Sequence, residues 1–263
     1  MNHALLSFFV INLFSINAAC SQDFTFHSDF ESYALSSNDP LKILLASDPT
    51  VDFNNYKVYE DKIEQTVERI KSKIGGKTTE RLLEKAFYLT HKKKLKWYTN
   101  YVTLADLLEN GTYDCLTGTA FFAVILKQLD ISFEIYEYDY HVLIVATLDN
   151  ERYLFESTDP FFGFEKEEKV IDKMLEAYSL SKGKISSNEM SQANLRQYES
   201  SHENKITLLQ LAGLQYFNLA IDAYNKERYP EASNLLAKAE YLYPSSRMYE
   251  ISLEFEQHLA INF

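Results

Sequence analysis

The sequence has few cysteines, few glycines and a deficit of basic residues. Among its 263 residues are two cysteines, which cannot build a disulfide framework or a multi-cysteine zinc site. No trio of its seven glycines follows the G-x-G-x-x-G spacing, which excludes a Rossmann-type dinucleotide loop. Lys and Arg number 26 against 38 Asp and Glu, giving a net charge of −12. This balance argues against nucleic acid as a partner, because nucleic-acid affinity depends on surplus cations.

Long hydrophobic runs are also scarce, although 46% of the residues are hydrophobic, enough for one substantial core or two modest ones. The apolar run 4–14 is too short to span a membrane, and small residues follow it at 18–21. We therefore expect a secretory signal peptide over residues 1–21, cleaved after Ser21, and an exported chain that is periplasmic or secreted. The alternative is lipoprotein processing, which would leave a lipid anchor on Cys20. No other stretch has the length and apolar character of a transmembrane span.

The first part of the mature chain has the hydrophobic period of helices. Apolar residues at helical spacing predict helices over residues 40–46, 56–74, 78–91 and 103–109. Residues 116–129 are apolar nearly all round, which predicts a buried helix.

The period changes to that of strands after residue 129. Alternating or β-branched runs predict strands over 133–138, 141–148 and 153–157, with Asp149-Asn150 as a turn. The sequence therefore predicts an α+β domain in which the buried helix packs on an antiparallel sheet.

The last third of the chain is predicted to be helical. A helix near 167–179 is followed by a charged, serine-rich linker, and the pattern from residue 206 onward is purely helical. Several positions in this tail resemble a tetratricopeptide repeat, namely Tyr216, Leu219, Ala220, Tyr229, Ala232, Leu236, Ala239 and Pro244. We thus expect a domain over 22–165, a helix and linker over 166–205, and a small all-α, tetratricopeptide-like region over 206–263. So few repeats cannot bury a continuous apolar face by themselves, so they must pack against the first domain.

Cys115 directly precedes the buried helix. A thiol at a helix N-terminus faces unpaired backbone N–H groups and the positive end of the helix dipole, and both favour the thiolate. The alternative is a small core residue, which is the common fate of a lone cysteine.

His141 and Asp159 follow Cys115 at the ends of predicted strands. If a three-residue loop joins the strands, His141 lies opposite Asp159, whose carboxylate can then orient the imidazole. A two-residue loop places Thr158 opposite His141 instead.

Cysteine at a helix start, histidine opening the second strand and Asp-Pro after the third together resemble the transglutaminase-like superfamily of papain-type thiol enzymes. The resemblance is carried by segments 113–120, 140–142 and 156–160, and it covers roughly residues 80–165. It is closest to bacterial exported members that join this core to tetratricopeptide-like helices. Leu116 departs from the bulky aromatic of many members, and Glu109 lies near the position of an oxyanion-hole glutamine.

The resemblance implies a catalytic triad and a thiol-dependent reaction. Cys115 would attack a carbonyl, His141 would carry the proton, and Asp159 would orient His141. The acyl group would pass to water, as in a protease or amidase, or to an amine, as in a transglutaminase. The substrate would be a protein or peptide, with no cofactor and no metal, and the oxyanion donor would be the backbone N–H of Cys115 or, second, Asn110. The alternative is a catalytically inactive scaffold that binds a partner protein through its tetratricopeptide-like helices.

Overall fold

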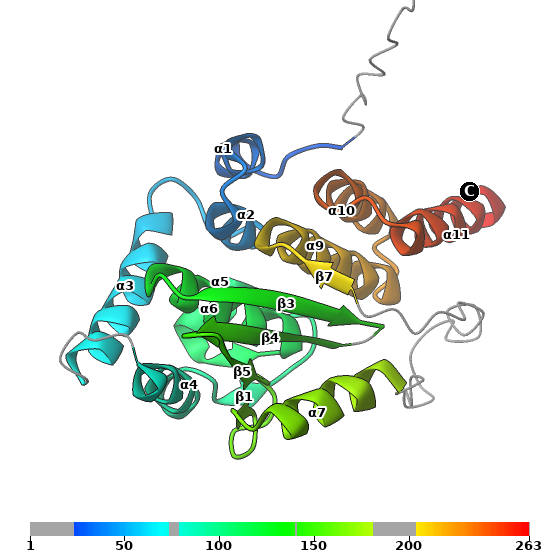
Figure 1. Cartoon of the computed structure of the whole chain (residues 1–263). Coiled ribbons are helices and arrows are strands. Elements are labelled where there is room, and N and C mark those ends of the chain that lie inside the picture. Colours follow the sequence, from blue (N-terminus) through cyan, green and yellow to red (C-terminus); the bar gives the residue numbers. More distant parts are fainter. Residues whose placement is uncertain (1–23, 74–78, 140, 181–203, 263) are drawn as a thin grey trace, which may run out of the picture.

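The computed structural model describes residues 24–73, 79–139, 141–180 and 204–262. The chain is an α+β fold in which a five-stranded antiparallel sheet lies among helices (Figure 1). The predicted signal peptide with Cys20, and most of the predicted linker, lie outside the described residues.

Six helices of the described part precede the sheet: α1 (Asp29–Ser37), α2 (Pro40–Ala46), α3 (Tyr56–Ser72), α4 (Glu80–Lys93), α5 (Leu104–Asn110) and α6 (Cys115–Gln128). The helices predicted from the period are confirmed, with ends that differ by a few residues. Helix α1 was not anticipated, although the hydroxyl of Ser28 accepts from the Glu31 N–H as an N-cap. Capping boxes begin α5 at Thr103 and α6 at Asp114.

The sheet has the spatial order β6-β5-β4-β3-β7. Its strands are β3 (Ser132–Tyr138), β4 (His141–Leu148), β5 (Glu151–Phe155), β6 (Phe164–Glu165) and β7 (Asn204–Ile206). A separate parallel pair is formed by β1 (Trp97–Tyr98) and β2 (Thr112–Tyr113). These two short strands were not anticipated, and neither were β6 and β7.

The turn between β4 and β5 has two residues, and it sets the register of the hairpin. Asp149 and Asn150 both have positive φ, 52° and 66°, and Leu148 pairs with Glu151. Two left-handed residues match the twist of the flanking strands, which favours this short loop. The three-residue register is therefore wrong, and the two-residue alternative is confirmed.

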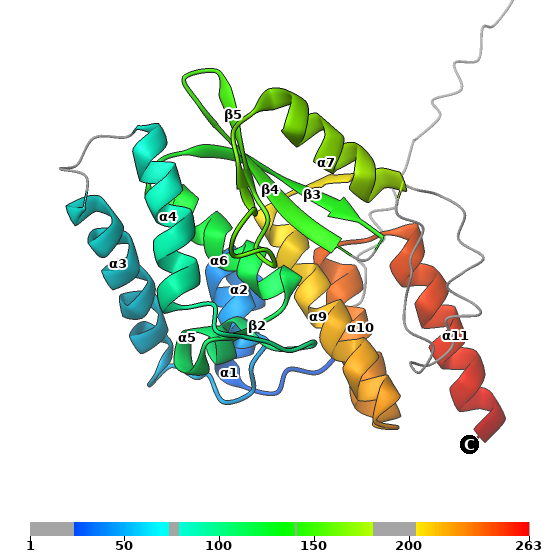
Figure 2. The same cartoon turned by 90° about the horizontal axis from the view of Figure 1, so that it is seen from below.

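The two faces of the sheet carry different helices. Val142, Ile144 and Ala146 of β4 belong to the hydrophobic core that contains α6, whereas Leu143 and Val145 pack with α7 (Glu168–Leu180). Figure 2 shows α7 on one side of the sheet and α6 with α9 on the other. Successive residues of a strand point to opposite faces, so this alternation places His141 on the α7 face.

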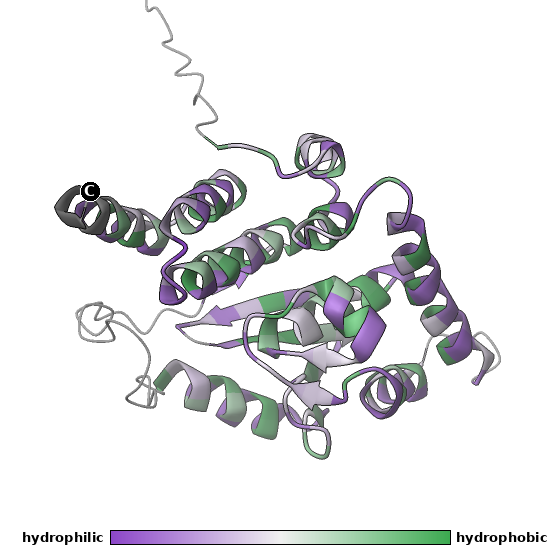
Figure 3. Cartoon of the chain, turned by 180° about the vertical axis from the view of Figure 1, so that it is seen from behind, coloured by the Kyte–Doolittle hydropathy of each residue, from purple (hydrophilic) through white to green (hydrophobic). Residues whose placement is uncertain are grey.

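The C-terminal helices continue the core of the sheet and its helices. Helices α9 (Leu208–Asn225) and α10 (Tyr229–Leu242) form a hairpin, followed by α11 (Ser246–Asn262). Helix α9 contacts both α2 and α6, and all three contribute to one hydrophobic cluster. Figure 3 shows the hydrophobic positions along α2 and α9, which lie side by side.

A buried ion pair links α1 to the C-terminal hairpin. Lys238 of α10 donates to both carboxylate oxygens of Glu31 at 2.7 Å, and Tyr216 of α9 donates to Oε1 at 3.0 Å. All three side chains are buried. None of the helices in the described part of the chain has the length and hydropathy of a membrane span.

Candidate functional site

Cys115 is the first residue of α6 and is half-buried. The preceding Asp114 fixes this helix start, because its side chain accepts from Thr117 N at 2.7 Å and from Thr117 Oγ1 at 2.8 Å. The same carboxylate accepts from the backbone N–H groups of Tyr101 and Val102. The position of the thiol is therefore tied both to α6 and to the segment that follows β1.

The start of α6 lies against the start of β4. Thr119, one helical turn after Cys115, donates its hydroxyl to the Val142 carbonyl at 3.1 Å. The Val142 N–H donates to the Cys115 thiol, and Ser157 Oγ donates to the Cys115 carbonyl at 3.3 Å. The thiol thus lies beside the residue that follows His141.

His141 is paired with Glu156, which directly follows β5. The ring Nε2 is bonded to Glu156 Oε2, which also accepts from Tyr178 OH at 2.9 Å. Glu156 Oε1 accepts from Thr158 N at 2.8 Å and from Thr158 Oγ1 at 2.7 Å. The Tyr178 ring of α7 stacks on the imidazole, with centroids 4.7 Å apart and planes 9° from parallel. The pair is therefore held from several sides.

Asp159 lies elsewhere in the loop after β5. Its Oδ1 accepts from Phe161 N at 3.0 Å and from Phe162 N at 2.9 Å, so it caps a turn. The structure thus corrects the expectation that Asp159 orients His141. Pairing of Ile144 with Phe155, continued along the hairpin, sets Thr158 opposite His141. Glu156 then shares the face of His141, whereas Asp159 has the opposite parity.

The surroundings lower the pKa of Glu156 and raise the pKa of Cys115. Burial by itself would raise the pKa of Glu156, but the hydrogen bonds from His141 and Thr158 and the charge of His141 hold it below its ordinary value. Burial raises the pKa of the Cys115 thiol to about 12, and the charges of Asp114 and Glu156 add to this rise. Hydrogen bonds from the Val142 and Leu116 N–H groups offset only part of it. The N–H groups therefore favour the thiolate, as the sequence predicts for a helix N-terminus, but burial outweighs their effect on the pKa of Cys115.

Cys115 packs with the α6 core and His141 lies on the α7 face of the sheet, so the two side chains approach each other only around the start of β4, where the Val142 N–H reaches the thiol. Within the described residues, no hydrogen bond joins the thiol to the ring, and Nδ1 of His141 has no hydrogen-bond partner. Glu156 therefore engages Nε2 of His141 and leaves Nδ1 without a bond to it.

Sequence reasoning missed three residues around this site: Glu156, Tyr178 and His91. Glu156 could have been found from the two-residue register, and Tyr178 from its helical spacing to Ile171 and Leu175, which are buried under the sheet. His91 of α4 is buried with its ring against Phe87, at 4.7 Å between centroids. Burial lowers the pKa of His91 to about 4, although the charges of Asp159 and Glu156 oppose this, so the ring is neutral at pH 7.

The oxyanion-hole candidates taken from α5 have other surroundings. Glu109 accepts from Tyr59 OH of α3 at 2.5 Å, and Asn110 is exposed at the end of α5. The backbone N–H of Cys115 is in the first turn of α6, where N–H groups lack intrahelical partners.

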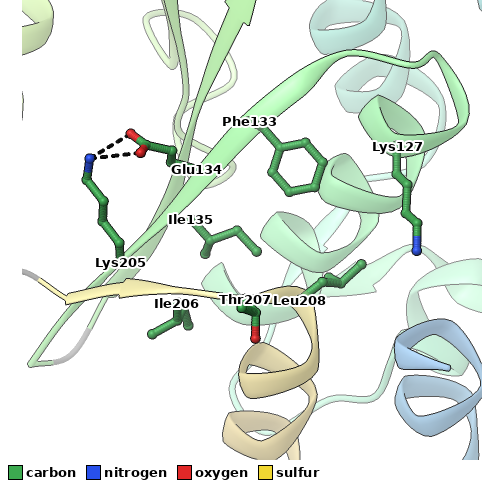
Figure 4. Close-up of a pocket in the computed structure, with 8 residues that line it drawn as sticks. All are labelled: Lys127, Phe133, Glu134, Ile135, Lys205, Ile206, Thr207 and Leu208. Atoms are coloured by element: carbon green, nitrogen blue, oxygen red, sulfur yellow. Dashed lines mark hydrogen bonds and ion pairs between the residues drawn. The ribbon is translucent and has the colours of Figure 1, made fainter. Parts of the chain in front are cut away.

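A separate cavity of about 430 Å³ lies between β3, β7 and the start of α9 (Figure 4). Phe133, Ile135 and Leu208 line it, and Lys205 at its edge is bonded to Glu134. Cys115, His141 and Glu156 are not among its lining residues. The described residues contain no group of three or more His, Cys, Asp or Glu side chains placed to hold a metal ion.

Comparison of the chain with protein-family models, with curated proteins and with solved structures gives no significant match.

Proposed function

We propose that the chain is a thiol enzyme of the transglutaminase-like type, in which Cys115, His141 and Glu156 act on an acyl or amide group. One observation carries this proposal. The buried carboxylate of Glu156 holds Nε2 of His141, and the Cys115 thiol at the start of α6 accepts a hydrogen bond from the N–H of Val142, the residue after His141. Glu156 takes the orienting role that the resemblance assigned to Asp159.

The thiol is neutral at rest, so its proton leaves as the bond to carbon forms. Cys115 Sγ attacks the carbonyl carbon, the thiol proton passes to Nδ1 of His141, and the carbonyl π electrons move to oxygen. Glu156 stabilises the imidazolium through Nε2. Collapse of the tetrahedral species expels the leaving group, which takes the proton back from Nδ1.

The thioester then passes its acyl group to water or to an amine by the same proton relay in reverse. The Cys115 N–H is our candidate donor to the oxyanion. The helix–sheet packing around α6, β4 and β5 supports a papain-like core as the finer description of the α+β fold.

The packing of the C-terminal helices supports the tetratricopeptide-like assignment, as the helix–sheet packing supports the papain-like core. Tyr216, Ala220, Ala232, Leu236 and Ala239 are all buried in the α9–α10 hairpin. Export of the mature chain belongs to the same proposal, and N-terminal sequencing of protein from its native host tests it.

The enzyme proposal is tested with an activated ester and the full chain. p-Nitrophenyl acetate should release a burst of one equivalent of p-nitrophenolate and leave an acetyl group on Cys115, as located by peptide mass spectrometry. The variant C115A should lose both signals. H141A should slow the burst by at least about 10²-fold, the usual size of a general-base contribution.

Lys169, an exposed residue of α7, supplies the control, and K169A should acylate within about twofold of the unchanged chain. Acetylation of Cys115 at the same rate in H141A, or acetylation of lysines alone, would favour the catalytically inactive scaffold.

A further inference from the structure

Four large aromatic side chains are exposed on two segments that are anchored at the candidate site. They are Trp97 and Tyr98 of β1, 67% and 55% exposed, and Phe161 and Phe162 of the loop before β6, each 77% exposed. We refer to these four residues as the aromatic rim. Exposed apolar groups held on ordered segments are a mark of binding surfaces.

The β1 part of the rim is joined to the strand that leads into Cys115. Tyr98 pairs with Tyr113 of β2, and Thr99 N donates to the Tyr113 carbonyl at 2.9 Å. The chain from Tyr113 reaches Cys115 after one residue. Partial burial raises the pKa of Tyr98, and its electrostatic interactions with Cys115, Asp114 and Glu156 add to the rise, as expected of a phenol near the thiol.

The second part of the rim is on a loop that runs from Glu156 to Gly163 and is closed by a hydrogen bond between these two residues. Glu156 N donates to the Gly163 carbonyl at 2.7 Å, and Gly163 N donates to the Asp159 carbonyl at 3.0 Å. The turn capped by Asp159 presents Phe161 and Phe162. Four residues of extended chain span at most about 14 Å, so the two phenylalanines stay within that reach of the loop base.

This loop also excludes a side chain at Gly163. A Cβ there would lie 2.2 Å from the Glu156 carbonyl oxygen and 2.3 Å from that of Asp159. The closure is therefore tight, and it fixes the phenylalanines relative to the carboxylate that holds His141.

We propose that the aromatic rim binds a large apolar side chain, aromatic or aliphatic, next to the carbonyl presented to Cys115. The substrate class is then peptides or acylated peptides with a bulky apolar residue at the reacting position. The position of the carbonyl rests on the proposed function, whereas binding of the apolar side chain needs no reaction at the thiol. The occupant is the substrate chain, because both rim segments are anchored at residues of the site.

The test uses Trp97, the single tryptophan of the chain, as a fluorescent reporter within the rim. The full chain carrying C115A, which prevents turnover, is titrated with N-acetyl-Phe-Gly-amide, N-acetyl-Leu-Gly-amide and N-acetyl-Gly-Gly-amide. We expect saturable changes in Trp97 emission with the Phe and Leu peptides. The Gly peptide should bind at least about tenfold more weakly, because burial of one large apolar side chain contributes that much.

The double variant F161A/F162A should weaken binding of the Phe peptide at least about fivefold. The matched control is Y249A, which removes an exposed aromatic of α11 (62% exposed), and it should leave the dissociation constant unchanged. Circular dichroism of each variant checks that the fold is kept.

Three results would contradict binding of an apolar side chain at the aromatic rim: equal affinities for the Phe and Gly peptides, no emission change with any peptide, or no effect of F161A/F162A. Trp97 emission that depends on protein concentration would also contradict it, because it indicates that a second copy of the chain covers the rim. If the chain binds the Phe peptide but gives no ester burst, the proposed enzyme function is wrong and binding at the aromatic rim stands. If the chain gives the burst but binds the Phe and Gly peptides equally, the enzyme function stands and binding at the rim is wrong.

Discussion

His141 on β4 and Glu156 after β5 are joined diagonally across a hairpin. The pairing of Ile144 with Phe155 sets Leu143 opposite Glu156, and His141 is the next residue along the same face. Diagonal neighbours are within reach of long side chains, and a glutamate bridges this gap to Nε2. Because Thr158 and Tyr178 occupy the other acceptor positions of the carboxylate, the imidazole is oriented before any substrate binds.

Replacement of this carboxylate should separate the roles of the two acidic residues in the loop. E156Q removes the charge that stabilises an imidazolium at His141, so the acylation burst should slow by at least about 10²-fold. D159N keeps an acceptor oxygen for the Phe161 and Phe162 N–H groups and should cost less than about threefold. Stopped-flow release of p-nitrophenolate measures both, and similar losses in the two variants would argue against Glu156 as the partner of His141.

The Cys115 thiol should lose its proton only at high pH. Because burial raises the pKa of Cys115 to about 12, its thiolate fraction grows tenfold per pH unit below that value. Iodoacetamide labelling of Cys115 should therefore keep rising through pH 10, whereas an ordinary thiol reaches a plateau above about pH 9. Peptide mapping separates Cys115 from Cys20, and a plateau near pH 9 would show that the sulfur is open to solvent.

Tyr178 is expected to act through His141 and Glu156. Y178F keeps the ring stack and loses one hydrogen bond to Glu156, so we expect a two- to fivefold slower burst. Y178A removes both contacts and opens one face of the imidazole to water, so we expect at least about a tenfold loss. Equal rates for Y178A and the unchanged chain would assign Tyr178 to packing alone.

The Glu31–Lys238 pair should dominate the stability of the contact between α1 and α10. K238M leaves a carboxylate buried without its cation, which costs about 3–5 kcal/mol in the free energy of unfolding. K205A breaks an exposed pair with Glu134 and should cost less than about 1 kcal/mol. Urea denaturation measures both, and the double variant E31Q/K238M should recover part of the loss.

The pH dependence of this pair follows from the pKa of Glu31. Burial would raise that pKa, but hydrogen bonds from His27 and Lys238 and the charge of Lys238 bring it below the ordinary 4.5. A carboxyl group whose pKa is lowered by folding stabilises the native state above its unfolded pKa. This stability is present at pH 7 and should be lost as the pH falls below about 4.5 in the unchanged chain but not in E31Q/K238M.

Hydrophobic period was enough to predict most of the helices and the three central strands. Residues 116–129 are apolar nearly all round, and residues 116–126 of α6 are all buried. The change to alternation after residue 129 coincides with β3, β4 and β5. These elements are long enough for a period to be counted.

The elements that were missed depend on tertiary contacts. Strands β1 and β2 have two residues each, too few for any period, and β7 exists because Ile206 pairs with Ile135. The partner of His141 was missed for a local reason, since a one-residue change in loop length moves every side chain of a strand to the other face.

The placement of α9 bears on how the chain is synthesised. Helices α2 and α6 emerge early from the ribosome, yet α9, which packs against both of them, is formed by residues 208–225, which are made much later. Strand β7, which pairs with β3 on the side away from β4, arrives at the same late stage. A nascent chain that ends before residue 204 therefore carries an uncovered apolar face and an open strand edge, both of which attract chaperones and promote aggregation. Cotranslational folding of this protein should consequently reach its native core only when nearly the whole chain has left the ribosome.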